Sequence, residues 1–270
     1  MRLSHLTFTG ADDSVDPEAL ARISARDPLV EWGILFDAEQ CGQPRFPSEA
    51  WRREFYRAAP HARRAAHVCG LPLLSELAAV ATPSASILGS ELCGESMMQP
   101  PFGRIQLNFD AQRLPLAVLT GLVAGWRGGR WRRANGAPLG LITQHNEGNL
   151  QVHELFAESS SDGRRYPAFY SVLFDASGGR GLQPATWPAR PHGLTCGYAG
   201  GIAEHNITAL LRSLAATEPE ALPVWFDIES SVRSGERLDL DKIGKVIEAV
   251  RAVADADVLD PSQLVRPPKP

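Results

Sequence analysis

The sequence predicts a single-domain α/β protein with the fold of a (β/α)8 TIM barrel. Short apolar runs alternate with segments of helical periodicity along the chain, and they recur about every thirty residues, as in barrels of this kind. No G-x-G-x-x-G motif follows the first apolar run, which argues against an open doubly wound sheet. With 270 residues, 44% of them hydrophobic, the chain can bury a full core. We expect the barrel over residues 1–258 and an irregular proline-rich C-terminal tail over 259–270.

The predicted strands are short apolar runs that end at a glycine or a polar residue. Such runs are typical of strands buried on both faces of a parallel sheet. In chain order they span Leu3–Thr9, Trp32–Phe36, Ala65–Cys69, Arg104–Phe109, Leu141–His145, Tyr170–Asp175, His192–Tyr198 and Val224–Ile228. We expect the strand interiors to be apolar and the polar side chains to gather at one end of the barrel.

Capping residues and apolar spacing predict the helices between the strands. Asp16 and Pro17 supply an N-cap and a first-turn proline for a helix that runs to about Arg26, and Ser48 caps the next helix. An interrupted, alanine-rich helical region follows the third strand. Apolar residues at helical spacing predict three later helices, at Leu116, Leu119, Leu122 and Val123, at Ile207, Leu210, Leu211 and Leu214, and at Ile243, Val246, Ile247, Val250 and Val253.

Composition and charge predict a soluble cytoplasmic protein. The net charge of −4 indicates neither a nucleic-acid partner nor an anionic membrane. The 4 cysteines lie apart, which favours free thiols in a reducing cytosol. No signal-peptide pattern is present, and the most apolar long segment, Leu114–Trp126, is too short to span a bilayer. Nothing in the sequence suggests a metal site or another cofactor, and the oligomeric state stays open.

Polar residues stand at the carboxyl ends of several predicted strands, where barrels of this class place their active sites. They are Thr9, Cys69, Asn108, His145, Asp175, Asp227 and Glu229, joined by Arg45 on the loop after the second strand. Each of these types also has a structural explanation, such as a satisfied loop histidine, a buried thiol or a hydrogen-bonded core aspartate. The arginines near residue 130 precede the fifth strand, so we expect them on the opposite, solvated face.

Glycine-rich loops after the sixth and seventh strands are candidate anion-binding sites. A run of glycines follows Asp175, and Gly200–Gly201 stands ahead of a predicted helix. Backbone amides and the positive end of a helix favour an anion, and barrels often bind phosphate between the loops after the last two strands. We therefore expect a small phosphorylated substrate, with its phosphate held by Gly179, Gly200, Gly201, Ser230 and Ser231.

Short motifs over most of the chain resemble those of the phosphoribosylanthranilate isomerase family, and their order and spacing fit one template. The matching segments are Phe174-Asp175 with Gly178-Gly179-Arg180-Gly181, Ala199-Gly200-Gly201-Ile202 with Asn206-Ile207, Phe226–Val232, Asp239–Ile243, Gly33–Phe36 with Pro44-Arg45-Phe46, and Ile105-Gln106-Leu107. The resemblance implies a (β/α)8 barrel of tryptophan biosynthesis that carries out an Amadori rearrangement of a phosphorylated aminosugar.

In that reaction a general base removes a proton from the sugar C2 and a general acid protonates the ring oxygen. The resemblance implies Asp175 as the acid and Arg45 as a substrate clamp. The Asp175 carboxyl needs a raised pKa, for which Asp227 and Glu229 are candidate neighbouring charges. The family's base cysteine, at the end of the first strand, is replaced by Thr9, whose hydroxyl is a poor base. Cys69 and His145 are then candidate bases.

Three functions stay open at this point. The first is isomerisation of a small phosphorylated sugar conjugate, the second is a lyase-type or aldol-type step on a phosphorylated small molecule, and the third is ligand binding without turnover. Retention of Asp175, Arg45 and Asp227 favours an enzyme, whereas the threonine at position 9 favours a binding protein. The absence of lysine at the end of any predicted strand argues against a Schiff-base aldolase.

Overall fold

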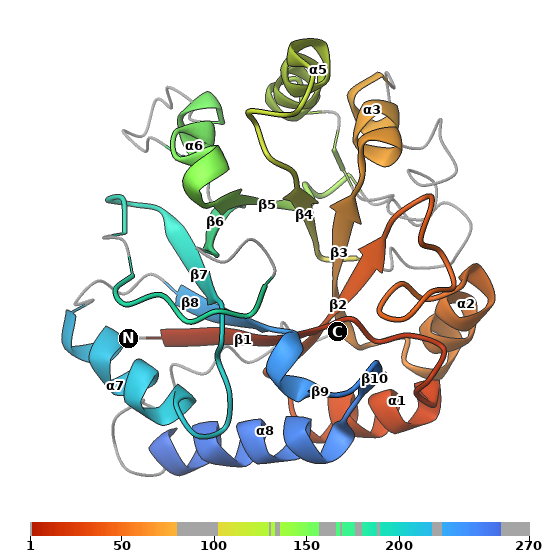
Figure 1. Cartoon of the computed structure of the whole chain (residues 1–270), viewed down its shortest axis with the longest axis vertical. Coiled ribbons are helices and arrows are strands. Elements are labelled where there is room, and N and C mark those ends of the chain that lie inside the picture. Colours follow the sequence, from red (N-terminus) through yellow and green to blue (C-terminus); the bar gives the residue numbers. More distant parts are fainter. Residues whose placement is uncertain are drawn as a thin grey trace.

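Parallel strands close into a barrel, which confirms the predicted fold class. In the computed structural model, neighbouring strands follow chain order, and β8 pairs with β1 to complete the ring (Figure 1). The strands are β1 (Arg2–Thr9), β2 (Val30–Phe36), β3 (Arg63–Cys69), β4 (Arg104–Asn108), β5 (Gly140–His145), β6 (Tyr170–Phe174), β7 (Thr195–Ala199) and β8 (Pro223–Ile228). They overlap every predicted strand, and the largest shift is in β7, which begins at Thr195 rather than His192.

The structure describes residues 2–79, 102–129, 131–132, 136–156, 166–167, 169–175, 180–187, 190–217 and 223–254. The predicted tail over 259–270 and the candidate phosphate ligand Gly179 lie outside these residues. So does most of the alanine-rich region that follows the third strand.

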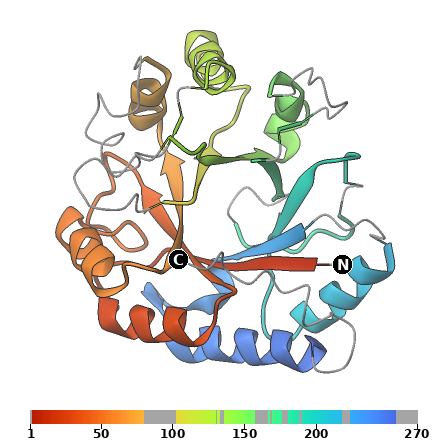
Figure 2. The same cartoon turned by 180° about the vertical axis from the view of Figure 1, so that it is seen from behind.

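Helices surround the strands, as both views of the cartoon show (Figures 1 and 2). They are α1 (Pro17–Arg26), α2 (Glu49–Ala58), α3 (Leu71–Ala79), α5 (Leu116–Arg127), α6 (Val152–Leu155), α7 (Ile207–Thr217) and α8 (Leu240–Ala254). Both predicted N-caps are confirmed, because the Asp16 side chain accepts from the Glu18 amide and the Ser48 side chain accepts from the Trp51 amide. On α8, the predicted stripe packs inward, with Ile243, Val246 and Val250 at most 1% exposed.

The barrel interior is not apolar, so the expectation of apolar strand interiors is wrong. Glu31 on β2 forms an ion pair with Arg104 on β4, and Thr7 on β1 donates a hydrogen bond to Glu31 over 2.9 Å. The Arg104 guanidinium also lies over the Trp225 ring, 4.6 Å from its centroid. Burial alone would raise the pKa of Glu31, but the charges of Arg104 and His5, together with hydrogen bonds from Arg104 and Thr7, outweigh it and lower that pKa to about 2. Pairing and hydrogen bonding are what permit these charges inside a barrel.

Trp225 fills part of the barrel interior because the neighbouring strand gives it space. Its indole packs with Ile142, Leu173 and Ala199 in a small buried apolar cluster. On the adjacent β7, a Cβ atom at Gly197 would overlap the Trp225 ring. A glycine at position 197 is therefore required by close packing against the indole rather than by an unusual backbone angle.

We expect Gly197→Ala to destabilise the protein by about 1–3 kcal/mol or more, because the added methyl group overpacks the core. Urea denaturation followed by circular dichroism measures this loss. Gly244→Ala is the matched control, since a Cβ atom there meets nothing within 4 Å and α8 continues through it. That control is expected to gain about 0.5–1 kcal/mol from helix propensity. Equal stability of the two variants would contradict the packing argument.

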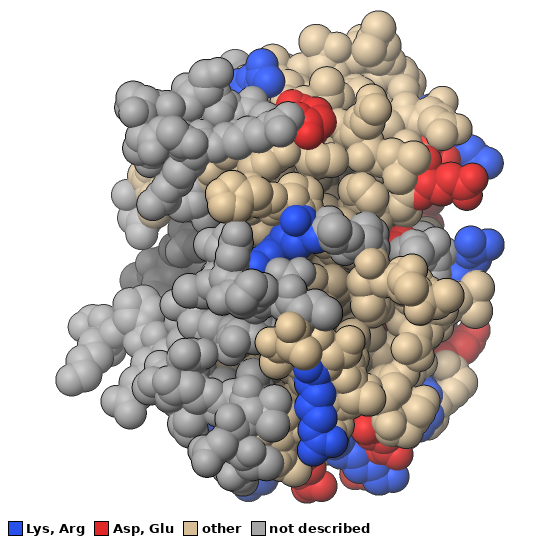
Figure 3. Space-filling view, turned by 90° about the vertical axis from the view of Figure 1, so that its left-hand side faces the viewer, with Lys and Arg blue, Asp and Glu red and all other residues tan. Residues whose placement is uncertain are grey.

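The charged side chains of the described residues are of mixed sign on the face in Figure 3, where blue and red groups are interspersed. This distribution is consistent with the small net charge of −4. No helix in the described part of the chain is long and apolar enough to cross a membrane.

Candidate active site

A cavity of about 800 Å³ opens at the carboxyl ends of the strands, the end at which the sequence predicts the site. Most of the predicted site residues line it, namely Arg45, Cys69, Asn108, Asp175, Gly200, Gly201, Asp227, Glu229, Ser230 and Ser231. Thr9 and His145 are not among the lining residues. The ends of distant strands therefore meet around one space, as barrel closure requires.

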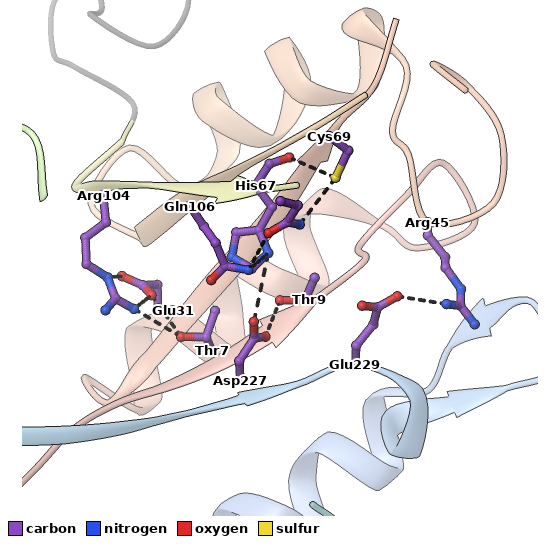
Figure 4. Close-up of polar contacts among 11 residues, drawn as sticks. Thr7, Thr9, Glu31, Arg45, His67, Cys69, Arg104, Gln106, Asp227 and Glu229 are labelled. Carbon is purple, nitrogen blue, oxygen red and sulfur yellow. Dashed lines mark hydrogen bonds and ion pairs between the residues drawn. The ribbon is translucent and has the colours of Figure 1, made fainter. Parts of the chain in front are cut away.

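A hydrogen-bonded group at the base of the cavity is centred on Asp227 (Figure 4). The buried Thr9 hydroxyl donates to Asp227 Oδ1 over 2.6 Å, and His67 Nδ1 lies 4.0 Å from Asp227 Oδ2. Gly33 makes this arrangement possible, because a Cβ atom there would overlap the Thr9 hydroxyl and touch the His67 ring. The Thr9 hydroxyl, at the position where the resemblance implies a cysteine, is thus a hydrogen-bond donor to a carboxyl group.

The Asp227 and Glu229 carboxyls have raised pKa values. Burial, reinforced by the negative charge of Asp175, raises the pKa of Asp227 from 3.8 to about 7. Burial, reinforced by Asp227, raises the pKa of Glu229 from 4.5 to about 7. The sequence suggested Asp227 and Glu229 as charges acting on Asp175, whereas in the structure the Asp175 charge contributes to the shift on Asp227. Carboxyls that titrate near neutral pH can both donate and accept protons there.

These pKa values predict that stability falls as the pH rises. The pKa of Asp227 is higher in the folded protein than in the unfolded chain, so its contribution is present below pH 4 and is lost as the pH rises through about 7. In the wild-type protein the unfolding free energy should fall between pH 5 and 8. We expect this fall to be smaller in Asp227→Asn by at least about 1.4 kcal/mol, the energy that corresponds to a pKa shift of one unit. Urea denaturation at several pH values measures it. The exposed Asp241→Asn serves as the control, and an unchanged pH slope in Asp227→Asn would refute the assignment.

Arg45 is fixed at the rim of the cavity by its backbone as well as its side chain. It has a φ of 76°, a positive value that non-glycine residues rarely adopt, and its amide donates to Asp12 Oδ2 over 2.6 Å. Arg233 in turn donates to the same carboxylate over 3.0 Å. The Arg45 guanidinium pairs with Glu229 over 2.8 Å (Figure 4). The loop after β2 therefore holds a cation against the carboxyl groups of the site.

Neither candidate base suggested by the sequence has favourable surroundings. Burial raises the pKa of the Cys69 thiol to about 12, which disfavours the thiolate at neutral pH. His145 lies against His153 and Phe174, with ring centroids 5.8 Å and 5.1 Å away. Burial and the neighbouring His153 lower the pKa of His145. Asp227 is a better candidate base, because its pKa lies near neutral pH.

The candidate phosphate loops after β7 and β8 lie beside one another. Gly200 and Gly201 line the cavity with φ angles of +104° and +64°. The backbone at Leu182 packs closely against these glycines, because a Cβ atom on Gly200 would lie 2.6 Å from the Leu182 carbonyl oxygen. The Ser231 hydroxyl donates to the Ile202 carbonyl and so joins the two loops. Backbone at this position can approach an anion closely.

Sequence reasoning missed His67 and Gln106, both buried yet lining the cavity. Gln106 Nε2 lies 3.3 Å from His67 Nδ1 and donates to Asn108 Oδ1 over 3.0 Å. Both residues could have been predicted from strand periodicity. His67 stands two residues before Cys69 and Gln106 two residues before Asn108, so each points to the same face of its strand as a predicted site residue. Among the described residues, no cluster of His, Cys, Asp and Glu side chains is arranged to hold a metal ion.

The fold is shared with enzymes of known structure. Phosphoribosyl anthranilate isomerase from Thermus thermophilus matches with a TM-score of 0.53 and 16% identity, over 92% of this chain and 99% of that one. A truncated 3-deoxy-D-arabino-heptulosonate 7-phosphate synthase from Thermotoga maritima matches with a TM-score of 0.51 and 12% identity, over 95% and 88%. No protein-family model matches the chain, and no curated protein matches its sequence. At these identities the comparisons establish the barrel fold alone, in agreement with the predicted resemblance.

Proposed function

We propose that the chain is an enzyme that isomerises a small phosphorylated sugar conjugate by general acid and base catalysis. In this proposal Asp227 is the base that removes the proton from the sugar C2. Asp175 is the acid: when Asp227 is ionised, the one proton that these two neighbouring carboxyls share lies on Asp175, which gives it to the ring oxygen. Arg45 clamps the substrate at the rim. The phosphate binds at the loops that follow β7 and β8.

The contact between Thr9 and Asp227 carries the proposal. Threonine replaces the family's base cysteine, and its hydroxyl donates to Asp227 Oδ1 over 2.6 Å. The carboxyl group adjacent to the lost thiol is thereby oriented, and burial raises its pKa to about 7. A base of that pKa is partly ionised at neutral pH and still binds a proton well. The base function is thus transferred to a neighbouring side chain.

The placement of charge across the cavity supports the same reading. Asp175, Asp227 and Glu229 line one region, and Arg45 neutralises part of their charge through its pair with Glu229. The glycines of the loop after β7 provide backbone that can approach a phosphate closely. The described strands contain no lysine, so a Schiff-base aldolase gains no support from them.

The test is a fluorescence assay with phosphoribosylanthranilate, the substrate that the resemblance implies. We expect turnover by the wild-type protein and a fall in kcat of about 100-fold or more in Asp175→Asn, since a positioned acid typically contributes that much. Asp241→Asn, on the exposed start of α8, is the matched control and is expected to retain full activity. Wild-type turnover that persists in Asp175→Asn would refute the assigned acid.

Ligand binding without turnover is the second candidate, and the Thr9 hydroxyl favours it because the inherited base is gone. Saturable binding of ribitol 5-phosphate with no turnover of any phosphoribosyl amine would establish that alternative. Absence of both binding and turnover would remove both functions and leave only the fold.

A further inference from the structure

Side-chain amides form a neutral wall on the side of the cavity away from the phosphate loops. Gln106 and Asn108 stand at the end of β4, Gln144 near the end of β5 and Asn146 directly after it, and all line the cavity. We call these residues the amide wall. Within each pair the members are two residues apart, so both face inward. Leu107 pairs with Thr143 in the β4–β5 register, which brings Gln144 level with Asn108.

We infer that the amide wall is a second substrate subsite, which takes a neutral hydrogen-bonding group such as a carboxamide at the end of the substrate remote from its phosphate. This inference rests on the proposed function, because it assumes that a phosphorylated substrate occupies the cavity. It adds the chemical class of the substrate's other half, which the phosphate loops do not define.

The position of the wall follows from the topology. Chain order around the closed barrel places β4 opposite β8, and β5 lies next to β4. A molecule whose phosphate binds after β7 and β8 therefore extends across the mouth toward Gln106, Asn108 and Gln144. Asp227 on β8 approaches the wall through His67, whose Nδ1 lies 4.0 Å from Asp227 Oδ2 and 3.3 Å from Gln106 Nε2. The reacting carbon of such a substrate passes over the carboxyl groups.

The wall is partly ordered in advance and retains unused hydrogen-bonding capacity. Gln106 donates to Asn108 Oδ1, and Asn108 Nδ2 donates to Cys69 Sγ over 3.3 Å. Gln106 Oε1 is buried and has no hydrogen-bond partner among the residues that the structure describes. The half-buried Gln144 side chain makes no hydrogen bond to any described residue. Amide groups of this kind offer donors and acceptors together, whereas an apolar ring would leave them unpaired.

No arginine or lysine stands at the described carboxyl ends of β3, β4 and β5 around the wall, which favours a carboxamide over a carboxylate. Burial lowers the pKa of His67 to about 3 and raises that of Cys69 to about 12, so both side chains are uncharged at neutral pH. The charged lining residues that follow β4 and β5 stand on the loops: Arg113 pairs with Asp110 over 3.5 Å, and Glu147 adds a further negative charge. Nothing at the strand ends themselves compensates a buried anion.

Stable amines made by reductive amination of ribose 5-phosphate test the inference. The probes are the conjugates of 2-aminobenzamide, aniline and 2-aminobenzoate, with ribitol 5-phosphate as the common fragment, and calorimetry on the full chain measures Kd. We expect the benzamide conjugate to bind roughly tenfold tighter than the other two, since unpaired polar groups penalise the aniline conjugate. Tighter or equal binding of the aniline or benzoate conjugate would overturn the inference.

The Gln144→Leu variant tests whether the amide wall causes the difference in affinity between the conjugates. It is expected to weaken binding of the benzamide conjugate roughly tenfold and to leave the Kd of the aniline conjugate within about twofold of wild type. Gln112→Leu, an exposed glutamine outside the cavity, is the matched control and should change neither affinity. Equal weakening of the binding of both conjugates by Gln144→Leu would refute a specific subsite.

If ribitol 5-phosphate binds and the benzamide conjugate binds no more tightly than this fragment, only this inference fails. If ribitol 5-phosphate and all conjugates fail to bind, the proposed function fails as well.

Discussion

Replacement of Asp227 by asparagine is expected to lower kcat for the proposed isomerisation about 1000-fold, because it removes the group proposed to accept the substrate proton. The asparagine side chain has nearly the same shape, and its carbonyl oxygen can still accept the hydrogen bond from Thr9. The fold should therefore survive, and the loss should fall on kcat. Steady-state kinetics with phosphoribosylanthranilate measures this loss directly.

Two further measurements separate a catalytic role for Asp227 from a structural one. In the wild-type protein, kcat/KM should fall as the pH rises through about 7, where the Asp175–Asp227 pair loses its shared proton. Binding of ribitol 5-phosphate should be unchanged in Asp227→Asn, because the phosphate loops are intact. A variant that retains a tenth or more of wild-type kcat would exclude Asp227 as the base.

Replacement of Glu31 by glutamine is expected to destabilise the protein by about 3–5 kcal/mol, the usual cost of leaving a buried partner charge uncompensated. Glu31 is 2% exposed and pairs with Arg104 inside the barrel. The neutral amide keeps an acceptor for Thr7 but removes the charge that Arg104 faces. Chemical denaturation by urea gives the free energy of unfolding for each variant.

Two comparisons identify the buried charge as the cause of that loss. Glu49→Gln removes the acid of an exposed i,i+4 pair with Arg53 on α2 and should change stability by less than about 1 kcal/mol. The double variant Glu31→Leu/Arg104→Leu should be more stable than Glu31→Gln, since it removes the orphaned charge together with its partner. A Glu31→Gln variant as stable as Glu49→Gln would show that Arg104 finds another counter-charge.

The barrel could be predicted because its signals are local and repeated. Each apolar run and each cap, such as Ser48 or Asp16, is determined by residues a few positions apart, and the structure retains these features. The ends of the parallel strands are then fixed by closure, which is why Cys69, Asp175 and Asp227 were expected at one mouth and do line one cavity.

The chemistry within the site was not predictable from spacing. The pKa of Asp227 depends on burial and on Asp175, a residue that lies far away in the sequence and close by only in the folded barrel. The Glu31–Arg104 pair could not be predicted for the same reason, because the sequence around a charged strand residue does not indicate a partner two strands away. Arg45 was placed on the correct loop, but its positive φ and its bond to Asp12 are products of tertiary contacts.

The packing of Trp225 against Gly197 links two positions that evolution cannot change independently. The space above Gly197 is occupied by the indole of the adjacent strand, so a side chain at 197 is accommodated only if residue 225 becomes smaller. Relatives of this chain should therefore carry either a glycine at 197 with a large aromatic residue at 225, or a larger residue at 197 with a small one at 225. This paired pattern is a criterion for recognising distant homologues whose overall identity is too low for alignment.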